Sequence, residues 1–126
     1  MRADDTVRLR HMIEACETVA AFIDRRDQRD LDGDRMLLFA VVRALEIVGE
    51  AASRMSAEMR AEYSDIPWQA MVGMRNRLVH AYFDIDTAIV WNAATVEAPA
   101  LLVALRSLDL AADHRGEPPT KSDIES

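Results

Sequence analysis

The sequence has little that constrains a chain covalently or breaks helices: one cysteine, four glycines, four prolines and only 6% aromatic residues. The lone Cys16 has no partner for an internal disulfide, so we expect a buried thiol in a protein of the reducing cytoplasm. No apolar run is long enough to span a bilayer, and the N-terminus lacks the apolar stretch of a signal peptide. We therefore expect no membrane attachment.

Positive charge is also scarce, because 22 acidic residues outnumber 15 basic ones and the net charge is −7. This balance excludes a surface that coats nucleic acid in general, so any nucleic-acid site has to be local. What is abundant is helix-forming: half the residues are hydrophobic, and Ala, Leu, Glu, Met and Arg are common. With 126 residues, the chain is expected to be one all-α domain.

Apolar periodicity predicts four helices, at about residues 6–23, 35–55, 67–81 and 88–108. Residues 24–34 are expected to form a loop, and residues 56–65 a short helical turn. Four such helices pack most simply as an antiparallel bundle. We expect a helical domain over residues 1–112, with possible short extra helices, and a flexible tail over 113–126, where apolar periodicity is lost.

Some single residues carry more specific expectations. In the first helix, the apolar set expected to face the core is Val7, Met12, Cys16, Val19 and Ile23. The residues expected to cap or complement helix N-termini are Asp4, Asp5, Asp32 or Asp34, and Asp84 or Asp86. Gly49 costs helix stability unless another backbone approaches closely, so close helix packing is expected there. Pro99 is expected to kink the last helix or to divide it in two.

The stretch "MRNRLVHAYF", residues 74–83, differs in charge from the rest of the chain. No acidic residue occurs between positions 67 and 82, so the local field is positive. On a helix of about 100° per residue, Asn76 and His80 share a face one turn apart. Arg75 and Tyr82 share an adjacent face two turns apart, and Arg77 points away from Arg75.

This arrangement combines a phosphate-binding guanidinium with a group that titrates near neutral pH. Cleavage of RNA through its own 2′-hydroxyl needs a base, an acid and a cation for the phosphorane, and no metal. A two-fold dimer would bring His80 and its copy into one cleft as base and acid. The plainer alternative is that an arginine and a histidine on one helix form a solvated helix end.

The segment "RNRLVHAY" resembles the Arg-X4-His-X-Tyr signature of HEPN-domain ribonuclease toxins, specifically the HepT-like (formerly DUF86) family. The blocks "VVRALEIVGEAASRMSAE", "IPWQAMVGMRNRLVHAYFDID" and "VWNAATVEAPALLVAL" resemble family blocks in the family's order. The resemblance covers nearly the whole chain up to about residue 110.

The resemblance implies an all-α, dimeric, metal-independent ribonuclease, the toxin of a type VII toxin–antitoxin pair, acting on tRNA or mRNA without a cofactor. Arg75 and His80 then correspond to the catalytic pair, and Asn76 to the supporting polar residue. Tyr82 corresponds to the residue to which an MNT-type nucleotidyltransferase antitoxin attaches AMP. The alternative is a non-catalytic helical module that binds such a nucleotidyltransferase.

Other polar groups have simpler interpretations. Glu46 and Glu50 are expected to form surface ion pairs with basic residues one turn away, such as Arg54. The alternative is that Arg43, Glu46 and Glu50 have a supporting role near the cleft. The "DLDGD" segment lacks calcium-loop spacing and is expected to cap a helix. His11 and His114 are expected to be solvated. The residues expected to pack in the core or an interface are Trp68, Trp91, Met36, Met55, Met59, Met71 and Met74.

Overall fold

The computed structural model describes residues 1–81 and 84–116, with side chains for 1–78 and 85–110. Its elements are α1 (Ala3–Ile23), α2 (Gln28–Gly33), α3 (Arg35–Ser53), α4 (Ala57–Glu62), α5 (Trp68–Val72), α6 (Met74–Leu78), β1 (Val79–Ala81), β2 (Asp84–Ile85), α7 (Thr87–Asn92), the π-helical segment η1 (Ala93–Glu97) and α8 (Ala98–Gly116). The predicted all-α class is confirmed, with one small β-hairpin added to it.

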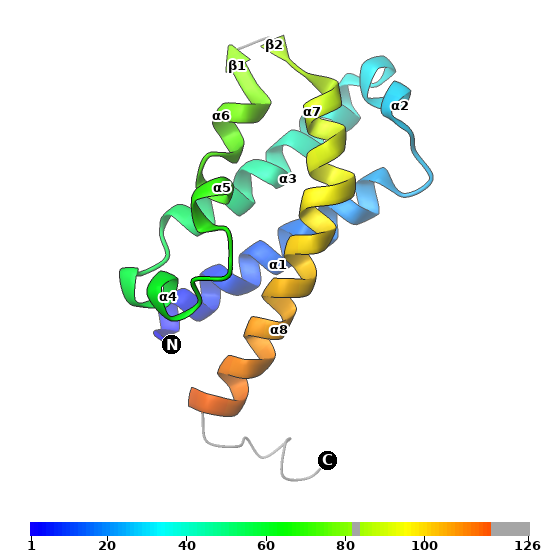
Figure 1. Cartoon of the computed structure of the whole chain (residues 1–126). Coiled ribbons are helices and arrows are strands. Elements are labelled where there is room, and N and C mark those ends of the chain that lie inside the picture. The colour runs from blue at the N-terminus through cyan, green and yellow to red at the C-terminus, as the bar shows by residue number, and fades with distance from the viewer. Residues whose placement is uncertain (82–83, 117–126) are drawn as a thin grey trace.

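Four helical arms run in alternating directions (Figure 1). α1 and α3 pack along each other, α8 packs across α1, and α5 and α6 lie against α3. α7, η1 and α8 form the last arm, whose upper end also contacts α2. The expected antiparallel bundle is therefore present, with α2 and α4 as short extra helices.

The face of α1 that enters the core includes the predicted Met12, Cys16 and Val19 but begins at Leu9 instead of Val7. Leu9, Met12, Cys16 and Val19 follow one another at three- and four-residue steps, and each is at most 2% exposed. Val7 lies off this face and is 53% exposed, so its predicted burial is wrong. The buried Cys16 has its pKa raised to about 11, first by desolvation and then by the nearby charge of Glu17, which leaves the thiol unreactive near neutral pH.

Most of the large residues assigned to the core are indeed buried. Met55, Met59, Met71 and Met74 are buried, and Trp68 is buried with its indole nitrogen donating to the carbonyl of Tyr63 at 3.0 Å. Met36 is the exception: it is 84% exposed at the start of α3, so the core alternative is wrong for it and packing in an interface stays a prediction.

The segment expected to be a loop between the first two long helices contains α2. Asp27 and Asp30 form a capping box at its N-terminus, and the fully buried Leu31 anchors it to the core. Leu31 is the only large apolar residue of that segment, and one such residue shows no helical periodicity from which α2 could be predicted. The predicted cap is confirmed, since Asp34 accepts a hydrogen bond from the backbone of Leu37 in α3.

Gly49 lies where α3 meets α5. A β-carbon at this position would come within 2.7 Å of the carbonyl oxygen of Met71. Since that oxygen belongs to the backbone, it cannot move aside as a flexible side chain would. The expected close approach of two helices is confirmed, and it holds the α5–α6 arm against the bundle.

Replacing Gly49 with alanine is expected to lower the free energy of unfolding by about 1–2 kcal/mol, because steric overlap exceeds the gain in helix propensity. The matched control is Gly33→Ala, since an added β-carbon there meets nothing within 4 Å. Urea unfolding followed by circular dichroism measures both. A Gly49→Ala variant as stable as the parent would contradict the close approach.

The last arm changes helix type just before Pro99. Pro99 has no N–H, and in an α-helix its ring would collide with the carbonyl of Thr95. The π-helical turn Ala93–Glu97 relieves this conflict, and the N–H of Ala98 donates to the carbonyl of Ala93. The predicted disturbance at Pro99 is thus a π-turn in a continuous helix.

The last helical arm, α7 to α8, is long and apolar. Residues 87–110 pass a length and composition test for a membrane-spanning helix, but Val90, Ala93, Leu101 and Leu105 fill the core, which accounts for much of that composition. α8 continues through Gly116, four residues beyond the expected domain end at 112, and residues 117–126 lie outside the described part.

Candidate functional site

The acid-free segment is divided into three elements. The predicted continuous helix over residues 67–81 is wrong, because α5 ends at Val72, Gly73 forms a turn, and α6 covers only Met74–Leu78. Beyond Leu78 the backbone is extended, and Val79 pairs with Ile85 across an antiparallel hairpin. A glycine and the β-branched Val79 both lower helix propensity, and the hairpin supplies alternative backbone hydrogen bonds.

His80 lies on strand β1. The hairpin pairs Val79 with Ile85 and Ala81 with Asp84, so His80 is the additional residue at a register irregularity. Such bulges are common next to active sites, where they change the direction of a side chain. The expected helical face shared by Asn76 and His80 is therefore wrong. The side chain of His80 and the whole of Tyr82 lie outside the described residues.

α6 presents its polar residues outward because its two ends are anchored. Met74 and Leu78 are 3% and 0% exposed, and between them Arg75 and Asn76 face solvent. Among the side chains that are described, none forms a hydrogen bond or ion pair with Arg75. Its guanidinium is thus available to an anionic ligand.

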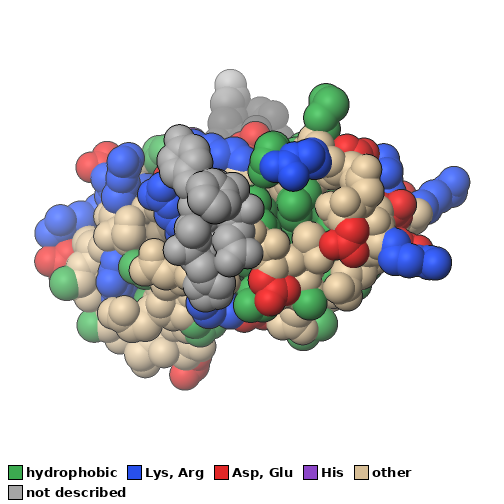
Figure 2. All heavy atoms as spheres, turned by 90° about the horizontal axis from the view of Figure 1, so that it is seen from above, with side chains coloured by type: hydrophobic (Ala, Val, Ile, Leu, Met, Phe, Trp, Pro, Cys, Tyr) green, Lys and Arg blue, Asp and Glu red, His purple; other side chains and the backbone are tan. Residues whose placement is uncertain are grey.

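Figure 2 looks down on the end of the molecule that carries α6 and the hairpin. Basic and acidic side chains both occur on this face, on either side of the residues that are not described. The positive character of the segment therefore stays local, as the net charge of −7 leads us to expect.

Arg77 differs from Arg75 because its guanidinium forms contacts within the protein. Its Nη1 donates to Oε1 of Glu97 at 2.9 Å, and its Nη2 lies 3.4 Å from the carbonyl oxygen of Ala70. Glu97 is the only charged residue between Asp86 and Arg106. Sequence reasoning missed Glu97, although an isolated acid in a long apolar stretch was a signal that could have indicated a specific partner.

The acidic residues of α3 pair at the surface, as expected, but with a different arginine. Arg43 contacts Glu50 at 3.0 Å and Glu46 at 3.6 Å, and the hydrogen bond to Glu50 is the main cause of the raised pKa of Arg43. Arg54 was the suggested partner of Glu50, and no such pair forms. No group of three potential metal ligands occurs among the described residues.

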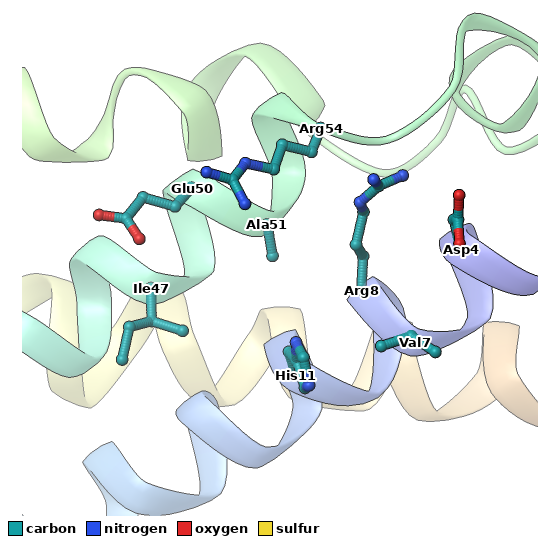
Figure 3. Close-up of a pocket in the computed structure, with 8 residues that line it drawn as sticks. All are labelled: Asp4, Val7, Arg8, His11, Ile47, Glu50, Ala51 and Arg54. Atoms are coloured by element: carbon teal, nitrogen blue, oxygen red, sulfur yellow. The ribbon is translucent and has the colours of Figure 1, made fainter.

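A hollow of about 270 Å³ lies between α1 and α3, away from α6. Figure 3 shows Arg8 rising from α1 and Arg54 extending over Ala51 toward the Glu50 side, away from Arg8. The residues lining it are Asp4, Val7, Arg8, His11, Ile47, Glu50, Ala51 and Arg54. Charged residues of both signs line this hollow, and none of the sequence-predicted site residues is among them.

An all-α domain whose sequence carries an Arg75-X4-His80-X-Tyr82 segment at a helix end is typical of HEPN-type domains. The family model described as "Ribonuclease HepT-like" matches residues 12–108. "Probable ribonuclease HepT" of Thermococcus cleftensis is 36% identical over 93 residues, which cover 74% of this chain and 84% of that protein.

"Putative RNase MJ1380" of Methanocaldococcus jannaschii is 34% identical over 90 residues, 71% of this chain and 83% of that protein. "Putative RNase TTE0752" of Caldanaerobacter subterraneus subsp. tengcongensis is 36% identical over 93 residues, with 74% and 83% covered. Comparison with solved structures gave no significant match. The chain belongs to the HepT-like ribonuclease family.

Proposed function

We propose that this protein is the toxin of a toxin–antitoxin pair and cleaves RNA, tRNA or mRNA, without a metal ion or other cofactor. The observation that carries the proposal is the exposed Arg75, which has no hydrogen-bond or ion-pair partner among the described side chains, on an acid-free segment that also contains His80. Membership of a ribonuclease family supports it. The proposed compartment is the cytoplasm.

In the proposed reaction, the RNA 2′-hydroxyl attacks the adjacent phosphorus. A base removes the 2′-hydroxyl proton, the bond from phosphorus to the 5′-oxygen breaks, and an acid protonates that leaving oxygen. His80 supplies the titrating group, and Arg75 stabilises the charge on the phosphorane. The products are a 2′,3′-cyclic phosphate and a 5′-hydroxyl. Asn76, exposed beside Arg75, is the supporting polar residue.

Two histidines are better suited to this chemistry than one, since one group then acts as base while the other acts as acid. We therefore include a two-fold homodimer in the proposal, with His80 of each protomer in a shared cleft. Static light scattering tests this: a strict monomer at micromolar concentration would remove the paired-histidine arrangement.

The proposed antitoxin is an MNT-type nucleotidyltransferase that attaches AMP to Tyr82. An AMP group two residues from His80 would add bulk and negative charge where the substrate phosphate has to bind. Modification there would inactivate the toxin through charge and steric exclusion.

The test of the proposal is incubation of the unmodified protein with total RNA in excess EDTA, beside a His80→Ala variant. We expect the parent to cut RNA and the variant to leave it intact, and mass spectrometry to detect the added mass on Tyr82 only after exposure to the antitoxin and ATP. If the parent, with Tyr82 unmodified, leaves RNA intact, the ribonuclease proposal fails.

A non-catalytic docking module is the second candidate. It is favoured by large apolar side chains left exposed where α1 ends and α3 begins: Phe22, Met36 and Phe39 are 39%, 84% and 48% exposed. Such a module would form a stable complex with a nucleotidyltransferase without cutting RNA by itself.

A further inference from the structure

The two arginines of α6 have different surroundings. Arg75 forms no hydrogen bond or ion pair with the described side chains, whereas the guanidinium of Arg77 reaches Glu97, the carbonyl of Ala70 and, at 3.7 Å, the sulfur of Met74. A guanidinium with this many internal partners has few donors left for a phosphate. Arg77 is therefore not a second phosphate-binding arginine beside Arg75.

Glu97 is held in a way that depends on Arg77. Its Oε1 accepts the hydrogen bond from Arg77, while its Oε2 is shielded from solvent and has no hydrogen-bond partner among the described residues. A carboxylate that is partly removed from water needs a nearby cation to remain ionised. Arg77 is the cation that the structure provides.

The location of the pair in the fold gives it a role. Glu97 ends the π-helical turn before Pro99, and that turn sets which side of the last arm Glu97 occupies. Between Arg77 and Glu97 in sequence lies the hairpin that carries His80. On the other side of the hairpin, the hydroxyl of Thr87 donates to Asp32 at 2.6 Å, which ties α7 to α2. Both ends of the hairpin segment are thus fixed.

We propose that Arg77 and Glu97 are positioning residues, which fix the base of the hairpin so that His80 stays in register with Arg75, and that Arg77 does not bind RNA. This inference rests on the proposed ribonuclease function for its catalytic consequence. The hairpin order that it requires is measurable without any activity.

The main test uses Glu97→Gln, which keeps the shape of the side chain and removes its charge. The matched control is Glu17→Gln, because Glu17 forms a comparable surface pair with Arg106 at 3.1 Å that joins α1 to α8 and leaves the hairpin untouched. Arg77→Lys serves as a second variant that keeps the charge but loses the two-pronged geometry. Circular dichroism confirms that each variant is folded.

Amide hydrogen exchange in residues 79–85 is expected to become about tenfold faster in Glu97→Gln and to stay unchanged in Glu17→Gln. RNA cleavage should show kcat about 10- to 100-fold lower with KM nearly unchanged, because misplacement affects the transition state more than binding. RNA binding should not weaken, because Glu97→Gln removes a negative charge and leaves the positive charge of Arg77 in place. The exchanged pair Arg77→Glu with Glu97→Arg should recover part of kcat.

Unchanged exchange and unchanged kcat in Glu97→Gln would overturn the inference. So would a rise in KM for Arg77→Lys without any effect of Glu97→Gln, because Arg77 would then contact RNA directly. If exchange accelerates as expected but the parent cuts no RNA, the hairpin role stands and the proposed ribonuclease function fails.

Discussion

Replacing Arg75 with alanine is expected to slow RNA cleavage about 100- to 1000-fold while leaving the fold intact. The physical reason is that a phosphorane gains negative charge in the transition state, and Arg75 is exposed on α6 with no ion-pair partner among the described side chains. Because Arg75 is exposed and forms no hydrogen bond or ion pair with the described side chains, its loss should cost little stability. Single-turnover cleavage of an RNA substrate, measured beside thermal unfolding, tests both expectations.

The series Arg75→Lys, His80→Ala and the double variant Arg75→Ala with His80→Ala sharpens this test. Lysine keeps the charge without the planar fork, so it should recover part of the rate. If both residues act in the same step, the cleavage rate of the double variant should be about the same as that of the slower single variant. A folded Arg75→Ala protein that cuts RNA at the parental rate would remove Arg75 from the mechanism.

Much of the fold could be predicted because its signals are local. The caps at Asp34 and Asp86 and the close approach at Gly49 are each consequences of one residue type in a short context, and each is confirmed. The error at Val7 has a different origin. Helical periodicity identifies a repeating spacing, but which of two neighbouring faces is buried depends on the position of α3 and α8, which is a tertiary property.

The site was less predictable than the fold. Residue types together with the family resemblance pointed to Arg75, Asn76 and His80 as candidates, but the helical wheel assumed that one helix continued to residue 81. The hairpin forms by pairing with Ile85, beyond the segment, and this pairing competes with helix formation at Val79. Likewise, the partner of Arg77 is 20 residues away in sequence, so no short-range pattern could reveal it.

The contrast between Arg75 and Arg77 explains how an acidic protein can offer a selective anion site. One guanidinium pairs with Glu97, and its neighbour on the same short helix is exposed without a partner among the described side chains. In the proposed function, the segment would attract one phosphate at a defined place without a broad basic surface that would hold RNA indiscriminately.

Replacing Asp5 with alanine is expected to lower the free energy of unfolding by about 3 kcal/mol, with a fall in Tm of about 10 °C. Asp5 is 1% exposed and accepts hydrogen bonds from the backbone N–H of Ser56 at 3.0 Å and from its hydroxyl at 2.6 Å. The same hydroxyl accepts from the N–H of Met59 and caps α4. Removing the carboxylate leaves buried donors without partners and weakens that cap.

The control is Asp4→Ala, which removes an exposed carboxylate from the same turn and should change stability by less than about 0.5 kcal/mol. Chemical denaturation of both variants measures the difference. Since α4 leads through α5 into the segment with Arg75, Asp5→Ala should reduce activity only where unfolding becomes appreciable. A lower kcat in fully folded Asp5→Ala would mean that the contact between Asp5 and Ser56 affects the site without unfolding. Equal stability of the two variants would contradict the stabilising role of the Asp5–Ser56 hydrogen bonds.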